Sequence, residues 1–198
     1  MGADKRSAAT TTPGASARSY ALDAFRGLAI IAMVVDHLVL VFAGPDALRL
    51  TVGRLAVPAF FILAGHLAGR LRWRHAGVFA VGLVLPLVVP WIDSPNVLVY
   101  WAVGCFVLAG CRRLGVPAWV LAAVALTAAA NGWGYGPGTG YEADALVGLM
   151  GLGALVPRSG FGFAGRAPGW VAAVGSRPLT WYVGHLVVLQ FLIVPMVR

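Results

Sequence analysis

The run from Leu22 to Gly44 constrains the fold most, because it is apolar and long enough to cross a lipid bilayer, which takes about 20 residues. It nevertheless contains Asp23, Arg26, Asp36 and His37. An ionisable side chain near the centre of a membrane helix costs about 2.5 to 3.5 kcal/mol on insertion scales and marks a functional site by default. We therefore expect a membrane helix that carries part of a functional site.

The composition predicts an integral membrane protein. The chain is 60% hydrophobic and 11% charged, whereas soluble domains are about 45–50% apolar and about 25% charged. The net charge of +8 could indicate a nucleic-acid partner. The basic residues cluster at the ends of apolar runs, however, as topology determinants do. We therefore expect the lipid bilayer as the partner and no nucleic acid.

The alternation of apolar runs and basic loops predicts an all-α, polytopic transmembrane helix bundle. About seven spans are expected, with six or eight left open, and the sixth is short for a ~30 Å bilayer core. We expect a disordered cytoplasmic tail over residues 1–19 and a single transmembrane domain over residues 20–198. In the last run, the part before Pro178 is a candidate interfacial segment. The expected spans are 22–44, 51–69, 76–91, 97–111, 117–131, 145–156 and 170–197.

The distribution of basic residues predicts the orientation. With the N-terminus in the cytoplasm, three basic loop or terminal residues lie outside, namely Arg49, Arg54 and Arg198. Many more lie inside. These are Lys5, Arg6, Arg18, Arg70, Arg72, Arg74, Arg112, Arg113, Arg158, Arg166 and Arg177. This positive-inside bias predicts a multi-pass protein of the inner (plasma) membrane with a cytoplasmic N-terminus.

Arg26 and His37 lie on one face of the first helix, about 16 Å apart along its axis. A buried neutral imidazole can act as a general base, so His37 is the first catalytic candidate. The alternative for His37 is a structural hydrogen bond between helices. Asp36 points about 100° away from His37, so it belongs either to the same catalytic site or to the solvated outer boundary.

Arg26 has two kinds of interpretation. Its guanidinium group could bind a phosphate or carboxylate. It could instead pair with Asp23 at i,i+3 or anchor the helix at the cytoplasmic surface. His66 and His185 are further candidates, with structural and functional roles weighed equally.

Other features favour structural roles. Cys105 and Cys111 lack metal-ligand spacing, so no metal is predicted. Four glycines are explained by close helix packing. They are Gly27, Gly65, Gly69 and Gly104.

The segment LDAFRGLAIIAMVVDH (22–37) resembles the first-helix signature of the membrane-bound acyltransferase superfamily. That superfamily includes the acyltransferase-3 proteins, the heparan-glucosaminide N-acetyltransferase group and the pilin-acetylating TraX-like proteins. PAFFILAGHLAGR (58–70) is similar to a second helix of the family, and MVVDH followed by GRLAVPAFFIL (53–63) resembles the TraX-like branch. GSRPLTWYVGHLVVL (175–189) is similar to the last-helix region of several branches. Many members have about ten spans, so this chain is short for the family.

The resemblance implies transfer of an acyl group, most simply acetyl, from acyl-CoA to a hydroxyl or amine. His37 would be the essential histidine, with Asp36 beside it, and Arg26 would contact the acyl-CoA phosphates. Arg70 would belong to the cytoplasmic entry of the co-substrate, and Arg54 is a further candidate for binding it. The acceptor is left open among a polysaccharide, lipid, peptide or small molecule, and a homo-oligomer is one possible assembly.

Two hypotheses from other classes stand beside this one. The first is a small transporter or channel subunit, in which intramembrane His and Asp side chains form a proton relay. The second is a membrane scaffold without catalysis. An acyltransferase needs acyl-CoA, a transporter does not, and a scaffold tolerates replacement of both Arg26 and His37.

Overall fold

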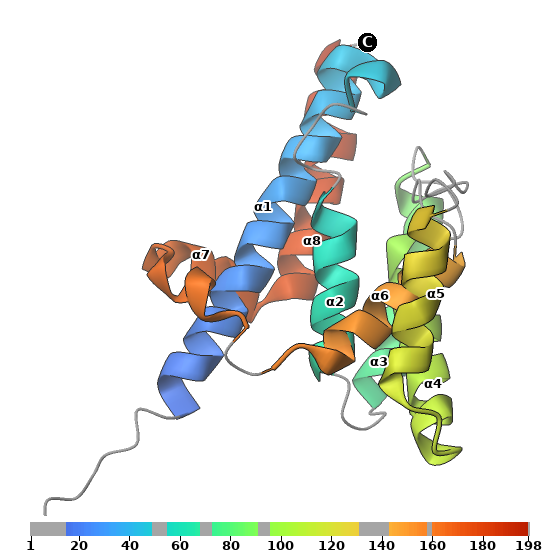
Figure 1. The fold of residues 1–198 in the computed structure, drawn as a ribbon. Coiled ribbons are helices and arrows are strands. Elements are labelled where there is room, and N and C mark those ends of the chain that lie inside the picture. The colour runs from blue at the N-terminus through green and yellow to red at the C-terminus, as the bar shows by residue number, and fades with distance from the viewer. Residues whose placement is uncertain are drawn as a thin grey trace, which may run out of the picture.

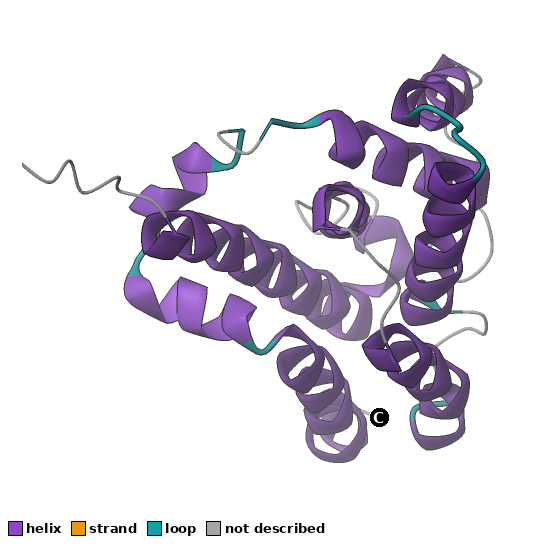
Figure 2. Ribbon diagram, turned by 90° about the horizontal axis from the view of Figure 1, so that it is seen from below, coloured by secondary structure: helices purple, strands orange, loops and turns teal. Residues whose placement is uncertain are grey.

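The computed structural model describes residues 15–48, 55–67, 73–90, 96–130, 143–157 and 160–197. Within these ranges the secondary structure is helical apart from the loops and turns, which Figure 2 draws in teal beside the purple helices. In chain order the elements are α1 (Ala15–Leu48), α2 (Ala56–Leu67), α3 (Trp73–Val88), α4 (Val97–Arg113), α5 (Ala118–Ala130), α6 (Ala143–Leu155), the 3-10 helix η2 (Gly162–Arg166), α7 (Gly169–Ser176), α8 (Pro178–Val188), the π-helical turn η3 (Leu189–Ile193) and α9 (Val194–Val197). The all-α prediction is therefore confirmed for the described residues.

Helix α1 is 34 residues long, and the C-terminal helices α7 and α8 pack along it. Figure 1 shows α7 beside its N-terminal half, while α8 runs alongside it in the same direction toward the C-terminus. Helix α2 packs between α1 and the group formed by α3 to α6. Successive helices from α1 to α5 alternate in direction, as expected for a chain that turns back at each connection.

Small residues allow α1 and α7 to approach closely. A side chain at Gly27 would collide with the backbone carbonyl of Val171, and one at Gly175 would collide with the carbonyl of Asp23. Packing at this distance requires residues without a Cβ, as in membrane helix pairs generally. The prediction for Gly27 is therefore confirmed, and α7 is fixed against the Arg26 end of α1.

A second close contact joins α2 to α6. The carbonyl of Met150 lies where a Cβ of Gly65 would be, and the Met150 sulfur occupies the equivalent place at Gly104. The surrounding cluster of buried side chains includes Phe61 and Cys105. The packing roles predicted for Gly65 and Gly104 are confirmed, while Gly69 lies outside the described residues.

Two helical stretches are long and apolar enough to cross a membrane in the part of the chain that the structure describes. They are Tyr20–Ala43, with 24 residues, and Pro178–Met196, with 19 residues. The apolar helices Ala56–Leu67, His75–Val88 and Ala145–Leu155 are shorter. The seven-span topology and its orientation therefore remain predictions.

The observed helices differ from the predicted spans mainly at their ends. Helix α1 begins at Ala15, within the segment expected as a tail, while residues 1–14 lie outside the described residues. It also continues to Leu48, beyond the predicted end at Gly44. The last predicted run is divided at Arg177, because Pro178 occupies the first position of α8, where its missing N–H is tolerated.

Two polar residues that the sequence interpretation did not single out are buried. Asn96, 2% exposed, caps α4 by accepting a hydrogen bond from the Leu98 N–H at 3.0 Å. Its amide also donates to the Gly82 carbonyl at 2.7 Å, which joins α4 to α3. His75, which immediately precedes the predicted span 76–91, lies in α3 and is stacked on Trp101 with ring centroids 5.4 Å apart.

Candidate functional site

Two histidines from opposite ends of the chain meet between α1 and α8. The Nδ1 atom of His37 lies 2.8 Å from the Nε2 atom of His185, although 148 residues separate them in the sequence. Their rings are nearly parallel, at 19°, with centroids 5.1 Å apart. The structure thus brings together two of the predicted candidates, and both side chains are half-buried.

The carbonyl of Trp181 determines the protonation pattern of the pair. It lies 2.9 Å from Nδ1 of His185, and a carbonyl can only accept, so His185 carries its proton on Nδ1. In the neutral ring, Nε2 of His185 is then an acceptor, and Nδ1–H of His37 must donate to it. The lone pair of His37 is left on Nε2, an assignment that follows from the hydrogen-bond partners.

This arrangement can hold a proton at a defined atom. A proton taken up at Nε2 of His37 turns the His37–His185 contact into a charge-assisted hydrogen bond, which is about twice as strong as a neutral one. A base oriented by a second hydrogen-bonded group is the general pattern of nucleophile activation in enzymes. We call the side chains of His37 and His185, together with the Trp181 carbonyl, the histidine pair.

Apolar side chains surround the inner side of the histidine pair. The ring of Tyr182 meets the His185 ring edge-on, with centroids 5.7 Å apart. Tyr182 belongs to a buried cluster with Met33 and Leu186, which are 5% and 0% exposed. A low-dielectric wall of this kind strengthens hydrogen bonds within the site.

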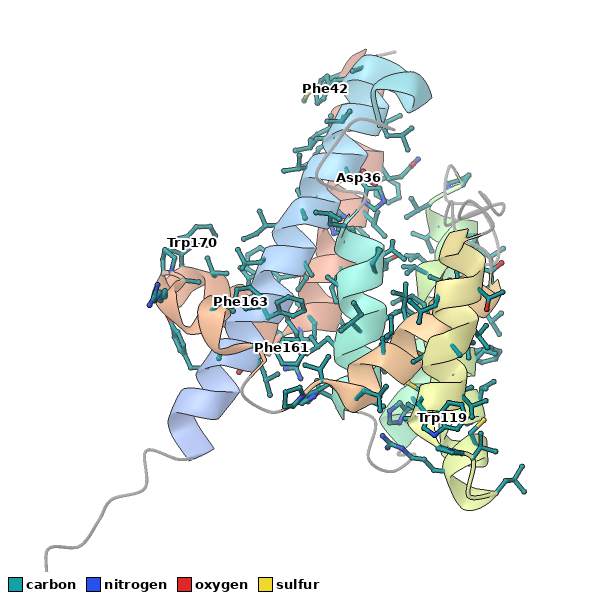
Figure 3. The ribbon with its side chains drawn as sticks, viewed as in Figure 1. Asp36, Phe42, Trp119, Phe161, Phe163 and Trp170 are labelled. Atoms are coloured by element: carbon teal, nitrogen blue, oxygen red, sulfur yellow. The ribbon has the colours of Figure 1, made fainter. Side chains whose placement is uncertain are left out.

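Asp36 and Arg26 take different positions along α1. Asp36, labelled in Figure 3, is half-buried in the upper part of α1. The His37 ring forms its hydrogen bond of 2.8 Å with His185. Arg26 forms an ion pair with Asp23, with 2.6 Å between Nη1 and Oδ1 and with side chains 25% and 27% exposed. The i,i+3 interpretation of Arg26 is therefore confirmed, and its binding of an anion remains a prediction.

His66 lies at the Arg26 end of α1 rather than with the histidine pair. Its Nδ1–H donates to the carbonyl of Val156 at 3.1 Å, and its ring meets Phe161 at a centroid distance of 4.8 Å. Phe161, labelled in Figure 3, also packs on Phe25, with 4.9 Å between the ring centroids. Phe25 precedes His37 by twelve residues, which is about 18 Å along a helix. These contacts agree with the structural alternative for His66, and a functional role for it stays a prediction. The other two candidates, Arg54 and Arg70, lie outside the described residues.

A π-helical turn follows His185 on the same helix. Turns of this type are rare and occur frequently at functional sites. Here Pro195 lacks an N–H and crowds the carbonyl four residues before it, which favours a widened turn. The turn contains Gln190, whose Oε1 atom is buried and has no hydrogen-bond partner among the described residues.

Among the described residues, no group of three or more His, Cys, Asp or Glu side chains is placed to hold a metal ion. The hydrogen bonds of the histidine pair suit it to take up and release a proton at Nε2 of His37.

A comparison with protein families matches the TraX protein family to residues 21–155, about two thirds of the chain. The chain belongs to the TraX protein family. Arg26, His37 and His66 lie within the matched segment, whereas His185 lies beyond its end. No curated protein and no solved structure matches the chain. Family membership confirms the TraX-like part of the resemblance, and with the two apolar helices it indicates a membrane-associated protein.

Proposed function

We propose that this TraX family member is an integral membrane acyltransferase that uses acyl-CoA, most simply acetyl-CoA. The observation that carries the proposal is the hydrogen-bonded histidine pair, which leaves a basic nitrogen on His37 within an apolar helix bundle. The acceptor is a hydroxyl or amine of an exported or membrane-associated molecule. The site is in the inner membrane, and the acyl donor reaches it from the cytoplasm.

In the proposed reaction, Nε2 of His37 removes a proton from the acceptor as the acceptor attacks the thioester carbonyl. The new C–O or C–N bond forms, the C–S bond breaks, and the proton is passed to the departing thiolate. Positioned general acid–base catalysis of this kind contributes about 10²- to 10⁴-fold to a rate. His185 holds the His37 ring in the required tautomer and stabilises its protonated form.

The remaining candidates have supporting roles in this proposal. Arg26 and Asp23 form an ion pair about 16 Å below the histidine pair, at the end of the helix where the co-substrate would enter. Arg54 and Arg70 are proposed to contact the same co-substrate. Asp36, next to His37 on α1, is proposed to adjust the charge of the site.

The test is acyl transfer by purified protein in nanodiscs, comparing the wild type with His37→Gln. We expect His37→Gln to reduce kcat by about 10²- to 10⁴-fold. The matched control is His66→Gln, because His66 is also a hydrogen-bonded, half-buried histidine but lies at the other end of α1. Wild-type turnover by His37→Gln would refute the proposal.

A second candidate function is favoured by the same hydrogen bonds. The chain from His37 through His185 to the Trp181 carbonyl also resembles the start of a proton relay in a transporter. Proton flux in liposomes without any acyl-CoA would support that function, whereas an acyl-CoA-dependent product supports the acyltransferase.

A further inference from the structure

A groove lies where α7 meets α8. It is lined by Trp170, Ala173, Val174, Ser176, Arg177 and Trp181, and its volume is about 490 Å³. Ligand pockets typically measure about 300 to 1,000 Å³. The groove lies beyond residues 21–155, the segment that the family comparison matches.

The lining of the groove combines one cation with two indole rings. Trp170 and Trp181 are 62% and 49% exposed, so their rings are open to a ligand. Arg177 is exposed, and no carboxylate among the described residues forms an ion pair with it. In contrast, the charge of Arg26 is balanced by Asp23. Arg177 therefore offers a guanidinium group for a phosphate, which it can bind with two parallel hydrogen bonds.

The groove is connected to the histidine pair through a shared residue. The side chain of Trp181 lines the groove, and its carbonyl holds His185. Arg177 is the residue that precedes α8, and its carbonyl accepts a hydrogen bond from the Trp181 N–H, while His185 follows Trp181 by four residues on the helix. Eight residues of helix place Arg177 about 12 Å from His185.

We infer that this groove binds the phosphorylated handle of the acyl donor, with Arg177 as the phosphate ligand and Trp170 and Trp181 as stacking surfaces for its purine base. Aromatic side chains can stack on any nucleobase, whatever its identity. An arginine guanidinium group recognises phosphate oxygens through two parallel hydrogen bonds. The acyl group would then extend along α8 toward Nε2 of His37. This inference rests on the proposed function, and it adds the groove between α7 and α8 to the donor contacts proposed for Arg26, Arg54 and Arg70.

The test measures binding rather than turnover. Acetyl-CoA is titrated by calorimetry into the full chain in nanodiscs for the wild type, Arg177→Gln, Arg177→Lys and Arg113→Gln. Arg113 is the matched control, because it is also exposed and next to a helix end but lies on α4. We expect Arg177→Gln to weaken binding about 10- to 100-fold, Arg177→Lys to recover most of it, and Arg113→Gln to stay within about twofold of the wild type.

A donor analogue without phosphates tests whether Arg177 contacts the phosphate groups of acetyl-CoA. Acetyl-pantetheine should bind weakly, and Arg177→Gln should not weaken it further. Unchanged acetyl-CoA binding in Arg177→Gln would overturn the inference, as would an equal loss of acetyl-pantetheine binding. It would also be overturned if Arg177→Gln lost retention of phosphatidylglycerol while acetyl-CoA binding remained intact, because the groove would then be a lipid site.

The two proposals can fail separately. Binding that depends on Arg177 without any His37-dependent transfer supports the groove and refutes the acyltransferase. Transfer that depends on His37, with binding that is insensitive to Arg177, supports the acyltransferase and refutes the groove.

Discussion

Replacing His185 with Phe removes the acceptor for His37 while keeping a flat ring between α1 and α8. The hydrogen bond from Nδ1–H of His37 to Nε2 of His185 is 2.8 Å long, and it becomes charge-assisted when His37 takes up a proton. Hydrogen bonds to charged groups contribute about 1.5 to 3 kcal/mol. If this amount is lost only in the transition state, kcat falls by roughly 10- to 150-fold.

The assay is steady-state acyl transfer with acetyl-CoA, in which kcat and KM are measured separately. His185→Phe should lower kcat and leave KM for acetyl-CoA nearly unchanged, because His185 acts through His37. Val188→Ala is the control, since Val188 lies on the same helix α8, is exposed and belongs neither to the histidine pair nor to the groove, so this variant should keep kcat. A wild-type kcat in His185→Phe would refute the role assigned to the histidine pair.

Two further predictions concern stability. Gly175→Val should lower the thermal unfolding midpoint by the equivalent of about 1 to 3 kcal/mol, because its side chain would collide with the Asp23 carbonyl, whereas Gly169→Val, in open space, should have little effect. Asn96→Ala should cost about 1 to 3 kcal/mol in the same measurement, because it removes a helix cap and a buried hydrogen bond to the Gly82 carbonyl. Thr127→Val is its control, since that hydroxyl bonds an exposed carbonyl within its own helix. Equal midpoints within either pair of variants would contradict the packing described for that position.

The helices themselves could be predicted well from the sequence, because apolar runs are interrupted by proline, glycine and basic clusters. The division of the last run before Pro178 and the short helix α6 are examples. The number of spans could not be settled in this way, since 13 residues of apolar helix, as in α6, extend only about 20 Å. Such helices are expected both in membranes and in buried cores.

Individual residues of the site could be predicted from the sequence, but the contact between the two histidines could not. Periodicity placed Arg26 and His37 on one face of α1, and the ion pair with Asp23 was among the local alternatives. The contact between His37 and His185 depends on how two distant helices pack, which helix periodicity does not specify. Trp181 could have been noticed, because a histidine four residues after it can reach its carbonyl.

A double-mutant cycle tests the central claim, that His37 and His185 act as one base. Residues that act as a unit give non-additive losses, because removing the first abolishes the contribution of the second. We predict that His37→Gln combined with His185→Phe transfers acyl groups as slowly as His37→Gln alone, measured in nanodiscs with saturating acetyl-CoA. If the two losses instead multiply, the histidines act independently, and the mechanism proposed for the pair is wrong.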